Sequence, residues 1–151
     1  MEKMNLRIMN EQDRELLIID LCGRLPYGVK CKIGNYNYVI CDISFEKQYD
    51  VFYNSGRHFP IGVIGTEDNG NTFHTSVYEK HVKPYLFPMS SMTEEQKIIY
   101  GDFVYEIVSS NPLEIQNRIS NLHDWLNKNH FDYRGLIEKG LAIDATNLNI
   151  Y

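Results

Sequence analysis

The chain has 151 residues, of which 43% are hydrophobic and 23% are charged, and its formal net charge is −5. This length and composition predict one globular domain spanning 1–151. No run approaches the ~18 consecutive apolar residues that a membrane span needs, and charged residues interrupt the first 20 positions, where a secretory signal would be apolar. We therefore expect a cytoplasmic protein with no membrane partner.

The charges are unevenly distributed along the chain. Residues 91–151 hold 5 Lys and Arg against 9 Asp and Glu, whereas residues 1–90 hold 10 against 11. A nucleic-acid surface needs clustered cations. In this chain, such a cluster would form only if four cations that are separated in the sequence gathered on one face of the sheet. Those four residues are Lys30, Lys32, Lys47 and Arg57. We therefore predict no nucleic-acid partner.

Sequence motifs of known chemistry are missing from the chain. It contains no P-loop, no dinucleotide-binding glycine pattern, no nucleophile elbow and no zinc-protease helix motif. Cys22, Cys31 and Cys41 include no C-x-x-C pair, which favours buried, reduced thiols over disulfides or a zinc site. His123 and His130 lie seven residues apart, whereas paired metal ligands on a helix usually lie three or four apart. We predict no cofactor and no metal.

The N-terminal third predicts a helix followed by a β-hairpin. Asn10 can cap a helix over 11–24, in which Leu17 and Leu21 repeat at a spacing of four. Pro26 then ends the helix. Gly34 and Asn35 separate the strands GVKCKI and YNYVICDISFE as the two-residue loop of a type II′ hairpin. An antiparallel sheet covered on one face is expected.

Side-chain alternation divides the second hairpin strand into two predicted faces. The residues expected to face the core are Val39, Cys41, Ile43 and Phe45. The residues expected on the opposite, partly solvated face are Tyr36, Tyr38, Asp42 and Ser44.

Further strands are predicted at 50–53, 59–64 and 72–78, with the turn-rich segment 66–71 joining the last two. Segment 83–88, KPYLFP, contains two prolines that lack a backbone donor, so we expect it to be an extended edge segment that leaves the sheet. The sheet is therefore predicted to be an antiparallel meander.

The chain beyond residue 90 is predicted to be helical. Ser91 or Thr93 can cap a helix over 93–108, and Asn111 can cap a second helix that ends near residue 129. The expected product is an α+β domain with an N-terminal helix, an antiparallel meander sheet and a C-terminal helical layer packed on the sheet. The predicted core residues are Leu17, Leu21, Val39, Cys41, Ile43, Phe103, Ile107, Ile119, Leu122, Leu126 and Leu136.

Segment 129–142, NHFDYRGLIEKGLA, is the most motif-like stretch, and most of it suits a short, well-capped helix. Asp132 can act as the N-cap, with Phe131 and Leu136 forming a hydrophobic staple. Gly140 can adopt the left-handed conformation that ends a helix, and Leu141 can then contact Leu136. We interpret these five residues as structural.

His130, Tyr133 and Arg134 are the residues of this segment that catalysis could use. The alternative to a binding protein is a small hydrolase or nucleotide-handling enzyme, with these residues in a cleft between the sheet and the C-terminal helices. That alternative requires them to converge with His74 or His81. The structural interpretation instead pairs Arg134 with a carboxylate of a neighbouring helix.

The favoured hypothesis is a non-catalytic, intracellular protein-binding module that is also able to self-associate. Tyr36 and Tyr38 would lie on the outer sheet face, and Tyr85, Leu86 and Phe87 lie between two prolines that keep their segment out of the sheet. Exposed aromatic patches commonly mark contact surfaces. In the alternative, the C-terminal helices cover these same tyrosines as a second core.

Three stretches taken together resemble a family of small proteins encoded in gut bacterial genomes, often within phages or mobile elements. They are LPYGVKC at 25–31, KPYLFPMSSMTEEQ at 83–96 and WLNKNHFDYRGLIEKGLA at 125–142. The family carries no assigned activity, so the resemblance transfers no catalytic residue. The chain departs from the family pattern at Phe87, where a basic residue is expected. The resemblance implies an accessory protein, inhibitor or counter-defence factor that acts by binding.

Overall fold

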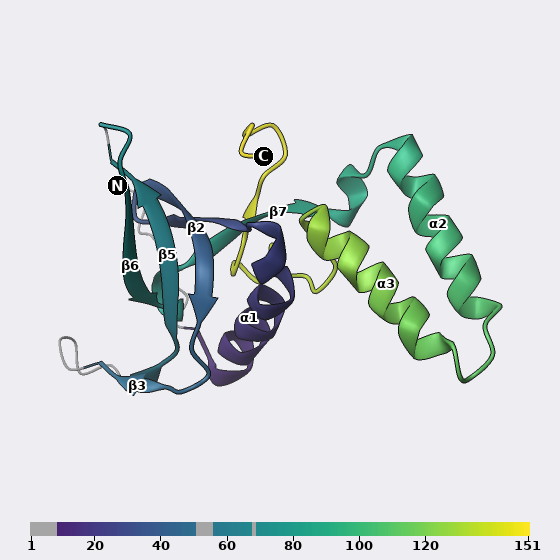
Figure 1. Ribbon diagram of the computed structural model, residues 1–151, viewed down its shortest axis with the longest axis horizontal. Coiled ribbons are helices and arrows are strands. Elements are labelled where there is room, and N and C mark those ends of the chain that lie inside the picture. The colour runs from purple at the N-terminus through teal and green to yellow at the C-terminus, as the bar shows by residue number, and fades with distance from the viewer. Residues whose placement is uncertain (1–8, 51–55, 68) are drawn as a thin grey trace.

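The computed structural model describes residues 9–50, 56–67 and 69–151. It contains an N-terminal helix, a mostly antiparallel sheet and two C-terminal helices (Figure 1), so the α+β class is confirmed. The predicted strand at 50–53 lies outside the described residues, apart from Asp50.

The N-terminal helix α1 spans Glu11–Arg24, as predicted. The Asn10 side chain caps it by accepting from the backbone N–H of Asp13 at 2.8 Å. A short 3-10 helix, η1 (Leu25–Tyr27), follows, and Gly28 then reverses the chain with φ 67°. A positive φ suits glycine because glycine has no Cβ. The helix therefore begins after Asn10 and ends before Pro26, as the sequence predicts.

Seven strands form the main sheet, in the order β6-β5-β2-β1-β7-β8, with β9 also paired to β7. Their bounds are β1 Lys30–Ile33, β2 Tyr36–Ile43, β5 Pro60–Thr66, β6 Thr72–Tyr78, β7 Lys83–Pro88, β8 Phe131–Asp132 and β9 Ile143–Asp144. The strands β3 (Gln48–Tyr49) and β4 (Arg57–His58) form a separate pair. Two 3-10 turns, η2 (Glu79–His81) and η3 (Met89–Ser91), flank β7. Among the described strands, β8 and β9 are the ones that pair in parallel, both with β7.

The predicted face assignment of β2 is wrong before a β-bulge in the strand, whereas Asp42 and Ile43 beyond the bulge face as predicted. Its pairing with β5 shifts between Ile40 and Asp42, which leaves Cys41 as the extra residue. Ile40 and Ile43 are both buried as a result, whereas Cys41 is exposed at the bulge. Phe45, which was also predicted to face the core, is exposed because it lies beyond the end of the strand. A bulge adds one residue to one strand and so reverses the alternation beyond it. Tyr38 shares the core face with Ile40.

Strand β7 is also placed differently from the prediction, since it lies inside the sheet. Lys32 and Cys31 pair with its first two residues, and β8 and β9 pair with its later part. The prolines do not prevent this arrangement, because neighbouring residues make the ladder bonds. The Phe87 N–H donates to the His130 carbonyl at 2.8 Å, and the Leu86 carbonyl accepts from Ala145 N–H at 2.8 Å.

The C-terminal helices α2 (Glu94–Val108) and α3 (Ile115–Lys128) form a hairpin that extends away from the sheet at the right of Figure 1. Thr93 and Gln96 form a complete capping box at the start of α2. Asn111 accepts from the backbone of Leu113 and Glu114, so it caps a turn that precedes α3. We call α2, α3 and their connecting loop, residues 94–128, the helical arm.

The core is divided into two clusters, and α1 rather than the arm covers the sheet. The first cluster joins α1 to the sheet and includes Leu17, Leu21, Ile43 and Leu136. The second lies at the base of the arm, where Met92, Leu126 and Phe131 pack at the β7–β8 edge of the sheet. Five predicted core residues are only half-buried: Val39, Phe103, Ile107, Ile119 and Leu122.

Segment 132–140 forms a turn rather than the predicted short helix. Asp132 does act as a cap, but its carboxylate accepts from the N–H groups of Leu136 and Ile137, at 2.9 and 2.8 Å. Gly135 has φ 74°, so the backbone after Asp132 is not helical and the turn begins only at Leu136. Gly140, with φ 72°, ends the turn. Phe131 and Leu136 belong to different clusters, so the predicted staple is not formed.

Candidate functional site

Two of the predicted binding residues lie together in a groove at one end of the sheet. Tyr36 is 72% exposed, while Tyr38 is half-buried against the first core cluster. They line a cavity of about 420 Å³, which we call the hairpin groove. Its other lining residues are Asn37, Thr66, Glu67 and Phe73. The sequence did not indicate Phe73, because its strand, β6, comes close to Tyr38 on β2 only through the order of strands in the sheet.

Gly65 shapes the floor of the hairpin groove. The rings of Tyr38 and Phe73 meet edge to face above it, with centroids 6.1 Å apart. A Cβ at position 65 would lie 2.5 Å from Phe73 Cζ and 2.7 Å from Tyr38 Cε1. Only glycine therefore lets the two rings approach each other over β5 without displacement.

The other three predicted binding residues are not a free surface. Tyr85 is 5% exposed and Leu86 is fully buried, which corrects the expectation that their segment leaves the sheet. The Tyr85 hydroxyl donates to Asn37 Oδ1 at 2.6 Å, and burial raises the pKa of Tyr85. Phe87 is half-buried, with its ring edge-on to Phe131 at 6.5 Å and tilted against Tyr151 at 5.9 Å between ring centroids.

Phe87 lines a second cavity of about 420 Å³, which we call the tail pocket. The residues that form its walls include Phe87, Gln96, Lys128, His130, Phe131 and Tyr151. The rings of His130 and Tyr151 stack at 3.7 Å. Burial, followed by the nearby charges of Arg24 and Lys30, lowers the pKa of His130 to about 4, so its imidazole is neutral near pH 7.

Tyr151 ties the C-terminal segment to the sheet. Its hydroxyl accepts from the backbone N–H of Lys30 at 2.9 Å and donates to the Tyr85 carbonyl at 3.0 Å. Burial raises the pKa of Tyr151 to about 12, so the hydroxyl keeps its proton and can donate. The His130–Tyr151 stack therefore belongs to a hydrogen-bonded anchor.

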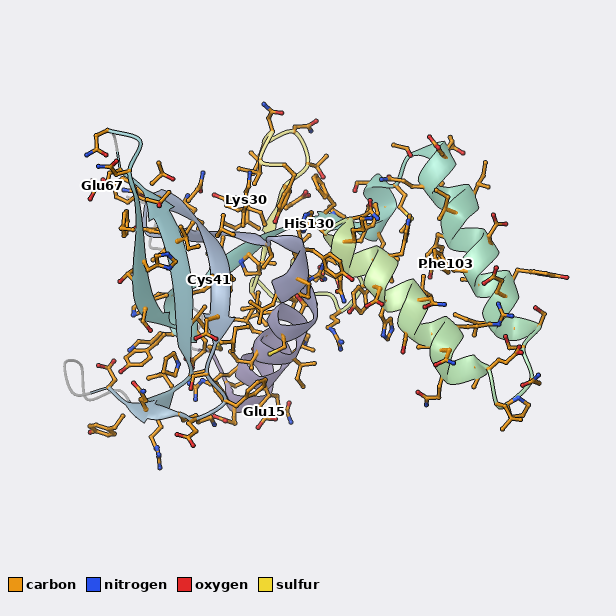
Figure 2. All side chains as sticks on the ribbon, viewed as in Figure 1. Glu15, Lys30, Cys41, Glu67, Phe103 and His130 are labelled. Carbon is orange, nitrogen blue, oxygen red and sulfur yellow. The ribbon has the colours of Figure 1, made fainter. Side chains whose placement is uncertain are left out.

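The predicted cleft of His130, Tyr133 and Arg134 with a second histidine is not formed. His74 lies on β6, five strand spacings from β8, or roughly 24 Å. His81 precedes β7, whereas His130 pairs near its far end, roughly 20 Å along the strand. Figure 2 shows His130 beside the arm and Glu67 at the distant end of the β5–β6 hairpin.

Tyr133 and Arg134 have structural partners. The Tyr133 hydroxyl donates to Asn127 Oδ1 at 3.0 Å, and Arg134 Nε lies 3.5 Å from Asp20 Oδ1 on α1. The predicted contact of Arg134 with a helix carboxylate is therefore confirmed. Within the part of the chain that the structure describes, no three His, Cys, Asp or Glu side chains gather as metal ligands.

An exposed apolar surface lies on α2, and the sequence analysis did not predict it. The helix contains no buried residue. Ile98, Tyr105 and Val108 are 66%, 73% and 79% exposed, and Leu113 in the loop at the tip of the arm is 92% exposed. The face on the other side of α2 packs on α3, where Phe103 lies 5.9 Å from Trp125 between ring centroids (Figure 2). The available signal was that the segment has apolar residues, among them Ile98, Tyr105 and Val108, in addition to the predicted core residues Phe103 and Ile107.

No protein-family model, curated protein or solved structure matches the chain. Among the described residues, no helix is long and apolar enough to cross a membrane.

Proposed function

We propose that this protein is a non-catalytic binding module whose contact surface is the outward face of α2. The observation that carries the proposal is that α2 is apolar around about two-thirds of its circumference, while α3 covers only one side of it. A helix with so wide an apolar surface is normally buried. The exposed half is therefore a surface that lacks its partner.

The hairpin groove is the second candidate for a contact surface. It is a hollow lined by six residues, whereas α2 exposes four large apolar side chains, Ile98, Val104, Tyr105 and Val108. The outward face of α2 is a continuous stripe on an arm that reaches away from the sheet (Figure 1), so a large partner can approach it. An accessory, inhibitor or counter-defence role, which the sequence resemblance implies, would act through this same surface.

A photoreactive phenylalanine analogue tests the proposal in cells that naturally carry the gene. Placed at position 105, it should form a covalent adduct with a protein after irradiation. The matched control places it at position 45, because Phe45 is 74% exposed and Tyr105 is 73% exposed, but Phe45 lies far from the arm. No adduct from position 105, or equal adducts from both positions, would show that α2 is not a contact surface.

A further inference from the structure

We propose that the hairpin groove binds a small alkylated ammonium ion, held between the rings of Tyr36, Tyr38 and Phe73 and the carboxylate of Glu67. The groove lies at one end of the β2, β5 and β6 strands, at the left of Figure 1, whereas the helical arm lies at the right. The site is therefore separate from the α2 surface, and it does not rest on the protein-binding function proposed for that surface.

Two of the rings form perpendicular walls over Gly65. Gly65 on β5 pairs with Phe73 on β6, and a Cβ at position 65 would meet the rings of both Phe73 and Tyr38. The planes of these two rings are inclined at 86° to each other. Glycine inside a strand often marks a position that a ligand approaches closely. The groove therefore has an aromatic wall on two sides and a floor without a side chain.

Tyr36 supplies a third ring, at the open side of the groove. Residues two apart on a strand share a face, so Tyr36 lies on the same face of β2 as Tyr38. Its side chain is 72% exposed. In the described ranges, 9–50, 56–67 and 69–151, this side chain makes no hydrogen bond and no ring contact. A large ring at the rim of a cavity, without a partner of its own, is available to contact a ligand.

Glu67 sets the charge of the ligand. It is the one charged residue among those that line the groove, and Figure 2 shows it at the end of the β5–β6 hairpin. Among the described residues, its carboxylate has neither an ion-pair nor a hydrogen-bond partner. The face of an aromatic ring is electrostatically negative, so the rings and the carboxylate both attract a cation and repel an anion.

The lining of the groove favours an alkylated ammonium ion over a metal ion. Calcium or magnesium needs several oxygen ligands, whereas this groove offers a single carboxylate and mainly aromatic carbon. An alkylated ammonium ion carries its charge on methyl groups that can contact ring faces, and sites built from several aromatic rings are a recurrent way of binding it. The cavity of about 420 Å³ is within the usual size range of small-molecule sites, about 300–1,000 Å³.

Nuclear magnetic resonance titration of the whole protein with choline tests the proposal. We expect saturable shifts of the amide signals of the groove residues, with a dissociation constant on the order of 1 mM. The matched control ligand is the neutral compound in which a carbon atom replaces the nitrogen of choline, because it keeps the shape and lacks the charge. It should bind at least about tenfold more weakly. Equal binding of the two compounds overturns the proposal, as do choline-induced shifts that are absent, confined to residues 94–128 or reproduced by sodium chloride.

Two substitutions separate the carboxylate from the ring. Glu67→Gln removes the charge, and Tyr36→Leu keeps an apolar side chain but has no ring face, so each should weaken choline binding at least about threefold. The matched controls are Glu46→Gln and Tyr49→Leu, because both residues are exposed and lie outside the groove. They should change the dissociation constant less than about twofold. All four positions are exposed, so we expect every variant to fold, which circular dichroism verifies. Unchanged choline binding by both groove variants overturns the proposal.

Discussion

Asp20 and Arg24 lie one turn apart on α1 and form an ion pair in which neither side chain is exposed. Arg24 Nε lies 2.7 Å from Asp20 Oδ2, and Arg24 Nη2 lies 3.0 Å from Oδ1. Nη2 also donates to the Phe131 carbonyl at 2.7 Å, which joins α1 to β8. The pair therefore connects the sheet-covering helix with the base of the arm.

Asp20→Ala should lower the free energy of unfolding by roughly 3–5 kcal/mol, because it leaves the buried guanidinium without its main counterion. The double replacement Asp20→Leu/Arg24→Met removes both charges and should cost much less. Urea unfolding followed by circular dichroism measures both values. Equal losses in the single and double variants would show that packing, not an unpaired charge, sets the cost.

Glu79→Gln should be strongly destabilising, by about 3 kcal/mol, although it changes few atoms. The Glu79 carboxylate is fully buried and accepts from the Phe59 N–H at 2.8 Å. Its Oε1 lies 2.7 Å from Arg14 Nε, in an ion pair, and 2.9 Å from His58 Nδ1. The amide keeps the shape but loses the charge that pairs with Arg14. Thermal unfolding of this variant beside Glu67→Gln, an exposed control, tests the prediction. A similar melting temperature for both variants would contradict it.

Gly65→Ala should destabilise the fold by about 1–3 kcal/mol, because the new Cβ collides with the rings of Tyr38 and Phe73. Phe73→Val removes the ring atom closest to that Cβ. In the Phe73→Val background, the added cost of Gly65→Ala should therefore be smaller, and a double-mutant cycle of unfolding free energies measures the difference. Strictly additive costs would show that the two positions do not interact.

Acid should destabilise the protein in part through His130, whose folded pKa of about 4 lies below its ordinary value of 6.5. The unfolded state then binds a proton more readily than the folded state, so unfolding free energy falls as pH falls from 6.5 to 4, by on the order of 2 kcal/mol. His130→Asn suits the φ of 60° at this position and should remove that component. The exposed His74→Asn control should keep the wild-type slope.

Cys41 should react with thiol reagents in the folded protein, whereas Cys31 should react only after unfolding. Cys41 is exposed at the β-bulge, while burial hides the Cys31 thiol and raises its pKa to about 12. Mass spectrometry after brief alkylation identifies the modified position. Modification of Cys31 before Cys41 would contradict the burial of Cys31 on β1 and the exposure of Cys41 at the bulge.

Local sequence signals determined the elements of this fold. The caps Asn10 and Thr93 marked the starts of α1 and α2, and Gly34 marked the β1–β2 turn with φ 60°. These signals succeed because a cap or a tight turn is satisfied by residues within four positions in the chain. Local bonding also explains why Asp132 was correctly assigned as a cap.

Only the tertiary structure decided which faces are buried and which residues meet. One inserted residue at Cys41 put Ile40 on the same face as Ile43, and two parallel strand partners placed β7 inside the sheet. Phe73 joined Tyr38 because β5 brings their strands together, and α2 kept an exposed stripe because α3 packs on its other side. These outcomes depend on strand register and on contacts between distant segments. Periodicity along a single element carries no information about either.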